Sequence, residues 1–252
     1  MAVSIFNRPK RQILPTVLAA QRQFPCESYS DCLAAITEIA SAGGSGDYKT
    51  AGFAIVQTGP WDVTAPIIIP AACIGLTISA VARVPITASG IVSSLFDVRA
   101  PLVTIRNLFV SSESVTDMFT AFVILGASTT KRLHVLFNDV VADRLYVETA
   151  SFTSSSAQIH GNEHSRVNLT ASAAVVLHGT SIKCSHNNLS DGGGDTITLG
   201  SGGSRNTIVG NDLGGGDYTS TASGGLNTFS SNTNVGTVTA HATDNTTGGN
   251  TA

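Results

Sequence analysis

Three acidic residues in the second half of the chain have the type and spacing to do chemistry. Asp139, Glu163 and Asp212 each stand directly after an asparagine, 24 and 49 residues apart. If coils of about 24 residues stack in register, Asp139 and Glu163 lie about 4.8 Å apart, near the separation of a retaining glycosidase pair. Glu163 and Asp212 would lie about 9.6 Å apart, as in an inverting pair. The spacing therefore offers candidates for glycoside hydrolysis.

The alternative interpretation, which we favour, is that these acids are ordinary turn residues. An acidic residue beside a corner asparagine is common in solvated turns. Sugar-cleaving grooves normally carry aromatic platforms, yet Trp61 is far away in the chain and Tyr146 is the only polar aromatic residue near the pair. Lyase chemistry on uronates needs calcium-binding carboxylates and a basic residue, and only Arg144 and Arg166 are near. We therefore predict no catalytic residue.

Histidines and glycine-rich runs suggest no cofactor. Four histidines fall within two repeats, at His160, His164, His178 and His186. Rings on a flat turn seldom converge on one ion without a defined second shell of partners. The glycine runs at 192–194 and 214–216 are not followed by the Lys-Ser/Thr pair of a phosphate loop. We predict neither a metal nor a cofactor.

The asparagines that precede the acids recur at near-constant spacing. They are Asn107, Asn138, Asn162, Asn187, Asn211 and Asn232, separated by 31, 24, 25, 24 and 21 residues. An apolar residue stands three positions before each asparagine except the first, where Thr104 breaks the rule. A period in the twenties, built from short strands and turn residues, is typical of a solenoid. We predict an all-β, right-handed parallel β-helix of about eight coils, with these asparagines stacked in a structural ladder of amides.

Composition narrows the function classes. Charged residues make up 12% of the 252 residues, against about 25% in an ordinary soluble domain. The formal net charge of −3 does not favour a nucleic-acid partner. No apolar stretch is long enough to insert in a membrane, and the first residues lack a secretory core, so we expect cytoplasmic synthesis.

The chain divides into four predicted parts. Residues 1–27 form an extended N-terminal arm, 28–45 a capping helix, 46–236 the parallel β-helix and 237–252 a polar C-terminal tail. The arm combines apolar residues with the basic residues that we expect to anchor it, Arg8, Lys10, Arg11 and Arg22. A frayed terminus is the alternative for the arm. The helix covers the first coil, whose strand edges would otherwise be open.

Residues 29–36 (with Leu-Ala-Ala-Ile), 53–56, 59–63 (Gly-Pro-Trp-Asp-Val) and 66–70 (Pro-Ile-Ile-Ile-Pro) resemble the N-terminal region of pectate-lyase-like β-helices of the phage tailspike and virion spike type. Residues 206–213 are similar to the repeat unit of that superfamily. The resemblance covers about residues 28–236 and implies a homotrimer. It specifies function poorly, because the superfamily contains lyases, hydrolases and inert fibres.

The resemblance leads us to expect a non-enzymatic structural component of a bacteriophage virion, located in the virion after synthesis in the host cytoplasm. A capsid-decorating head fibre and a tail-associated spike both remain open. The expected partners are further copies of the chain, capsid, portal or tail proteins through residues 1–27, and a host surface glycan. The alternative is a small tailspike depolymerase acting on host polysaccharide as a hydrolase or lyase. A bacterial adhesin is a third hypothesis.

Overall fold

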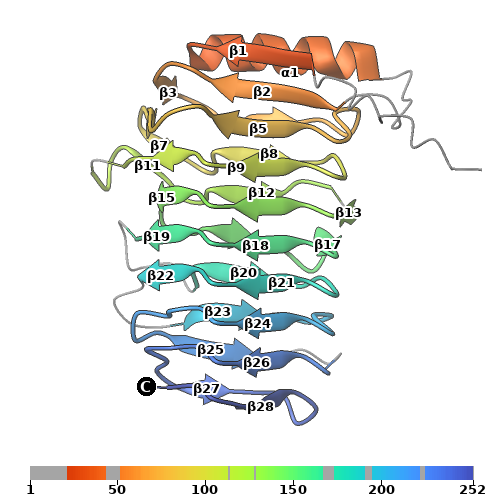
Figure 1. Ribbon diagram of the computed structural model, residues 1–252, viewed down its shortest axis with the longest axis vertical. Coiled ribbons are helices and arrows are strands. Elements are labelled where there is room, and N and C mark those ends of the chain that lie inside the picture. Colours follow the sequence, from red (N-terminus) through yellow and green to blue (C-terminus); the bar gives the residue numbers. More distant parts are fainter. Residues whose placement is uncertain are drawn as a thin grey trace, which may run out of the picture.

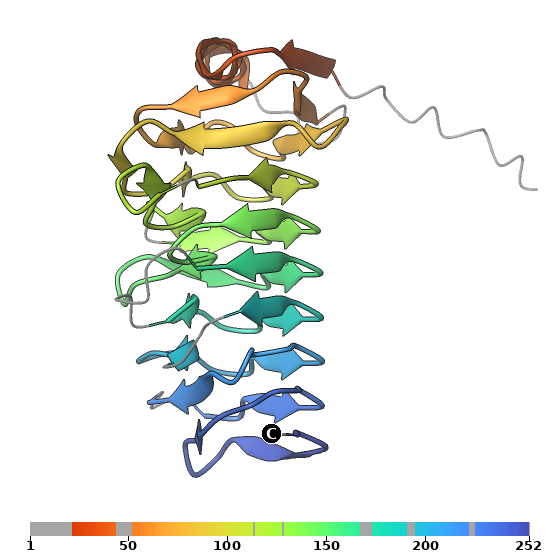
Figure 2. The ribbon, with the colours of Figure 1, turned by 90° about the vertical axis from the view of Figure 1, so that its left-hand side faces the viewer.

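The chain folds into an elongated stack of coils with one helix across its N-terminal end. The computed structural model describes residues 22–43, 52–112, 114–127, 129–166, 173–190, 195–221 and 225–251. Helix α1 (Tyr29–Gly43) lies across the first coil, and the C-terminus lies at the opposite end of the stack (Figures 1 and 2).

Three parallel sheets run along the stack, which we call sheets A, B and C. Sheet A contains, in spatial order, β1 (Arg22–Cys26), β2 (Phe53–Gln57), β5 (Thr77–Ala80), β9 (Thr104–Arg106), β14 (His134–Leu136), β18 (Gln158–His160), β21 (Lys183–Ser185), β24 (Thr207–Val209), β26 (Thr228–Ser230) and β28 (Asn245–Gly248). Sheet B contains β3 (Trp61–Val63), β6 (Pro85–Ala88), β10 (Phe109–Val110), β15 (Asp139–Val141), β19 (Glu163–Ser165) and β22 (Asn188–Ser190). Sheet C contains β4 (Ile67–Ile69), β8 (Phe96–Val98), β12 (Val123–Leu125), β16 (Tyr146–Val147), β20 (Val175–Leu177), β23 (Asp195–Leu199), β25 (Asp217–Ser220) and β27 (Val238–Thr239).

Two short pairs complete the described strands, β7 (Ile91–Val92) with β11 (Met118–Phe119), and β13 (Thr129–Lys131) with β17 (Thr153–Ser155). Each strand in the three large sheets pairs in parallel with the equivalent strand of the next coil, as in a right-handed parallel solenoid. The predicted β-helix class is therefore confirmed.

The expected count of about eight coils is corrected to about six. Six turns have a strand in all three sheets, because sheet B has six strands. Beyond β22, sheet B is continued in the described residues by isolated bridges at Asp212 and Thr233. The run of glycines at 214–216 follows the first bridge. Because glycine has no side chain to pack, it weakens strand pairing there.

The core consists of columns of inward side chains, one from each coil. The sheet A column is fully buried and contains Ile55, Ile78, Ile105, Val135, Ile159, Cys184, Ile208 and Phe229. Neighbouring members lie about one strand spacing apart, roughly 4.8 Å. Each member is thus covered by the members above and below it.

Both ends of the chain contribute strands to the stacked coils. The expected arm at 1–27 includes β1, which pairs in register with β2. The expected tail at 237–252 includes β27 and β28, which continue sheets C and A.

Helix α1 begins with a reciprocal cap. The Asp31 carboxylate accepts a hydrogen bond from the backbone N–H of Ser28 at 3.0 Å, and the Ser28 hydroxyl accepts one from the backbone N–H of Asp31 at 3.3 Å.

Five of the six spaced asparagines form a buried ladder. The side-chain amide of each donates to Oδ1 of the next, at 2.9–3.2 Å, through Asn138, Asn162, Asn187, Asn211, Asn232 and finally Asn250. From Asn162 onward, each Oδ1 also accepts the backbone N–H of the preceding ladder asparagine. Each side-chain amide also donates to a backbone carbonyl one coil back. The amides are therefore satisfied within the interior.

Asn107 is not a ladder member, which corrects the first repeat. Its side chain is exposed, and the backbone N–H of the neighbouring Leu108 bonds Oδ1 of Asn138 at 3.1 Å. Asn107 instead begins a column of left-handed corner residues with φ between 54° and 66°, followed by Phe137, Gly161, His186, Gly210, Ser231 and Gly249. Asparagine suits that column because it tolerates left-handed backbone. When the first repeat is shifted by one residue in the alignment, the inward apolar position is occupied by the buried Ile105 and not by Thr104.

Candidate functional site

The three candidate carboxylates occupy one column, at the corner where sheet A passes into sheet B. Asp139 pairs with Glu163 in adjacent strands, and Glu163 pairs with Asn188. An isolated bridge then joins Asn188 to Asp212. Asp139 and Glu163 are thus one coil apart, whereas Asn188 lies between Glu163 and Asp212.

Asp139 is already engaged by a basic residue. Its Oδ2 forms an ion pair with Nη2 of Arg83, whose guanidinium carbon also lies 4.3 Å from the centre of the Phe109 ring. The side chains of Arg83 and Asp139 are 71% and 33% exposed, so water screens the pair. Together with Phe137 and Asn107 they line an open hollow of about 350 Å³.

Asp212 is engaged as well, although by uncharged groups. Its two carboxylate oxygens accept from the Asn234 amide at 2.8 and 3.0 Å. Its Oδ1 also accepts the backbone N–H of Gly214 at 3.0 Å. These contacts are those of an acid that closes a turn. Glu163 is exposed and borders the corner beside them.

An aromatic strip, which the sequence did not reveal, lies at the same corner. Phe137 stands edge-on to His160 with ring centres 5.2 Å apart, and His160 stands edge-on to His186 at 5.3 Å. Phe137 is 56% exposed. The left-handed backbone just before each ladder position turns the side chains of Phe137 and His186 outward. The detectable signal was their position directly before Asn138 and Asn187.

Other residues expected near a site are inside the rod. Tyr146 is fully buried, and its hydroxyl donates to Oε1 of Glu148 at 2.9 Å. His164 occupies the inward column between Val140 and Leu189, and its Nε2 donates to the backbone carbonyl of Ala142 at 3.1 Å. Burial is the main cause that lowers the pKa of the His164 imidazole to about 4; the hydrogen bond to Ala142 opposes this shift and the charge of Arg166 adds to it. Tyr146 therefore offers no platform for a sugar.

Glu148 is a buried acid that sequence reasoning missed. Its carboxylate accepts from the Tyr146 and Ser154 hydroxyls and from the backbone N–H groups of Ser154, His178 and Gly179. Burial raises the pKa of the Glu148 carboxyl above its usual range, although these donors oppose the shift. Since its partners come from two coils, Glu148 links coils and is closed to solvent.

Of the four residues expected to anchor the arm, Arg8, Lys10 and Arg11 lie outside the described residues. Arg22 pairs with Glu38 of α1 at 2.6 Å, and both side chains are more than half exposed. In the described ranges, no helix is long and apolar enough to cross a membrane. The same part of the chain contains no group of His, Cys, Asp and Glu side chains suited to hold a metal.

Comparisons with family models, with curated proteins and with solved structures found no match to this chain. The corner combines an exposed aromatic strip, one ion pair and an exposed glutamate on an open surface. Such a surface can make contacts with a flat polar partner. Of the three candidate carboxylates, Asp139 is bound by Arg83 and Asp212 by Asn234.

Proposed function

We propose that this chain is a non-enzymatic structural component of a bacteriophage virion, a short β-helix spike or fibre that assembles as a homotrimer. Residues before β1 attach it to capsid, portal or tail proteins, and the stacked coils project from the particle. The resemblance of residues 29–36 and 53–70 to virion spikes supports the phage assignment. A head fibre and a tail-associated spike both agree with this proposal.

The observation that carries the non-enzymatic part is the engagement of Asp139 by Arg83. A retaining mechanism needs one carboxylate as nucleophile and the other as acid, and both must face the substrate. Asp139 and Glu163 are the adjacent pair, and Asp139 is turned to Arg83. Glu163 and Asp212 would form the wider pair, but Asp212 is held by Asn234. The corner is therefore better suited to contact than to hydrolysis.

The experiment that tests the proposal is imaging of purified particles with a tag at the C-terminus. A label at one fixed place on the virion, in groups of three copies, supports it. Particles that lack the protein, while infected cells contain it, would rule it out. Deleting residues 1–21 leaves β1 intact, and we expect this variant to form the same oligomer but to be missing from particles.

The alternative, a depolymerase, is separated by a second measurement. Purified protein is incubated with capsular or lipopolysaccharide glycan of the host, and new reducing ends or unsaturated uronates are measured. We expect no release, and the double variant Asp139→Asn, Glu163→Gln should match the wild-type protein. Release that the double variant abolishes would establish the enzyme instead.

A further inference from the structure

The outward side chains of sheet C form a single column along the rod. In each strand from β4 to β25 one outward residue stands between two buried ones, and neighbouring strands pair in register. We call these residues, together with Thr239 of β27, the sheet C outer column; the others are, in spatial order, Ile68, Asp97, Ile124, Val147, Val176, Thr198 and Thr219. All but Asp97 are β-branched, uncharged and at least partly exposed.

The one acid in this column adds no net charge to it. The Asp97 carboxylate is paired with the Arg99 guanidinium at 2.7 Å, and the Asp97 side chain is 13% exposed. From Ile124 to Thr239 the column contains no ionisable group. β-Branched side chains have few rotamers, so they lose little conformational freedom when another surface covers them. The column is therefore suited to burial against an uncharged surface.

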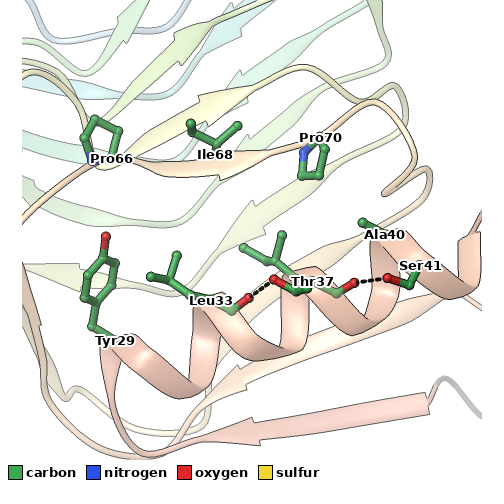
Figure 3. Close-up of a pocket in the computed structure, with 9 residues that line it drawn as sticks. Tyr29, Leu33, Thr37, Ala40, Ser41, Pro66, Ile68 and Pro70 are labelled. Atoms are coloured by element: carbon green, nitrogen blue, oxygen red, sulfur yellow. Dashed lines mark hydrogen bonds between the residues drawn. The ribbon is translucent and has the colours of Figure 1, made fainter.

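An uncharged groove continues the column at the N-terminal end of the rod. It lies between α1 and β4 and has a volume of about 620 Å³ (Figure 3). Ile68, the first residue of the column, and Leu33 of α1 line it and are 45% and 37% exposed. The hydroxyls of Thr37 and Ser41 donate to helix carbonyls at 2.9 Å, and all the described residues that line the groove are uncharged. Exposed apolar surface thus extends from the column to the helix.

The outward faces of sheets A and B are charged instead. Sheet A turns Arg106, His134 and Lys183 outward, and sheet B turns Asp139 and Glu163 outward. When parallel rods associate around an axis along their length, each residue beside the axis meets its own copies at the same height. A charged residue in that position would face like charges. Of the three sheets, sheet C is the one that can surround such an axis without repulsion.

A second copy of the rod also matches the spacing of the column. Neighbouring outward residues are about 4.8 Å apart, so the whole column is about 34 Å long, and each residue would meet its equivalent along that length. A strip one strand wide, about 10 Å, offers about 340 Å² per copy. A standard interface buries about 800 Å² per partner. The column would therefore form the uncharged centre of a contact whose rim is the groove and the corners beside sheet C.

We propose that the sheet C outer column is the surface through which copies of this chain associate in parallel, with three sheet C faces surrounding the axis of the spike. This inference rests on the proposed homotrimer and identifies its interface. Val147 and Val176 lie near the middle of the contact, each opposite its own copies. The groove between α1 and β4 meets the neighbouring copy at the N-terminal end of the rod.

This arrangement decides which surfaces remain free in the assembly. Sheets A and B and the corner between them face away from the axis. The aromatic strip of Phe137, His160 and His186 is therefore exposed three times around the spike. Contacts with other proteins along the rod would be made there, while the uncharged face of sheet C is hidden.

Cross-linking in the full chain tests which face is inside. Sheets packed face to face lie about 10 Å apart, so a short bis-maleimide should join Val147→Cys copies into linked dimers on a denaturing gel. Gln158→Cys, exposed on sheet A, is the matched control and should stay unlinked, because the native cysteines are all buried. Light scattering measures the oligomer in both variants. A trimer that is not linked through residue 147, or is linked equally in both variants, overturns this inference and leaves the homotrimer; a monomeric wild-type protein overturns both.

A charge in the column should separate the copies without unfolding the coils. Val176→Asp places three like charges around the axis, and we expect loss of the trimer in size-exclusion chromatography with light scattering. Its circular dichroism spectrum should match that of the wild type, because Asp97 shows that the same column accepts an outward acid. Gln158→Asp should remain a trimer. A folded Val176→Asp trimer would overturn the inference, and if that variant does not fold, the cross-linking result decides.

Discussion

The Oδ1 atom of Asn162 accepts two hydrogen bonds from Asn138, one from the backbone N–H at 3.0 Å and one from the side-chain amide at 2.9 Å. Neighbouring coils are therefore joined by a buried side chain as well as by their backbones. Because each amide has partners on both sides, a change at one coil leaves groups unpaired in its neighbours. That dependence is specific enough to measure.

Replacing Asn187 by alanine should destabilise the rod strongly. The change removes the acceptor of the Asn162 backbone and side chain, and the donor to Ile159 and Asn211. Each buried group left unpaired costs about 1–3 kcal/mol, so we expect a loss of about 2–5 kcal/mol in the free energy of unfolding. Denaturant unfolding measures it. Asn188→Ala, at the adjacent exposed position, should change it by less than about 0.5 kcal/mol; similar losses in both variants would contradict the ladder's role.

The inward columns predict opposite outcomes at two consecutive residues. Ile208 is fully buried between Cys184 and Phe229, whereas the next residue, Val209, is partly exposed on the outer face. Ile208→Asp should prevent folding or lower stability by several kcal/mol, because the charge would have no partner in the core. Val209→Asp should leave the circular dichroism spectrum and melting temperature nearly unchanged. A folded, stable Ile208→Asp variant would be incompatible with this packing.

Acid should weaken the protein through His164. Its pKa is lowered to about 4 in the folded state, against 6.5 ordinarily. Between these values the unfolded chain binds the proton and the folded chain does not, so stability falls as the pH drops from about 6.5 to about 4. The loss attributable to this residue is about 3 kcal/mol.

His164→Leu provides the comparison, because Leu189 fills the next position of the same column. The difference in unfolding free energy between wild type and variant should be independent of pH above about 7 and change steadily below 6.5. Parallel curves for the two proteins across that range would show that His164 titrates normally.

Glu148 should be essential to stability although it interrupts an aliphatic column between Leu125 and Leu177. Glu148→Leu would continue that column but leave the N–H groups of His178, Gly179 and Ser154 without their acceptor. We expect a loss of about 3 kcal/mol or more in thermal or denaturant unfolding. Leu125→Met, a swap of similar volume in the same column, should cost less than about 1.5 kcal/mol. A Glu148→Leu protein as stable as wild type would refute the bridging role.

The repeat could be read from the sequence, but its first register could not. Counting asparagines placed Asn107 in the ladder, and the exception at Thr104 was the sign that the alignment was one residue out. Residue type alone was ambiguous, since asparagine suits both a buried amide ladder and a left-handed corner. The strand pairing of β9 with β14 decides it, because Leu136 is opposite Arg106 and Asn138 is therefore opposite Leu108.

The contacts at the candidate site were less accessible to sequence reasoning than the fold. The column of Asp139 and Glu163 follows from the period alone. That Arg83, 56 residues earlier, reaches Asp139 depends on coils two turns apart meeting at one corner. The burial of Tyr146 was not predictable either, because whether a strand residue faces inward depends on where the strand begins.

The sequence by itself determined that the chain winds into stacked parallel coils, because a period of apolar and corner residues fixes which side chains must lie above one another. It also determined that asparagines would hydrogen-bond along the stack. Only the tertiary structure decided the exact register, the six full turns, the burial of Glu148 and His164, and the pairing of Asp139 with Arg83. Those depend on contacts between residues in different coils, and such distances are set by packing in three dimensions and not by separation along the chain.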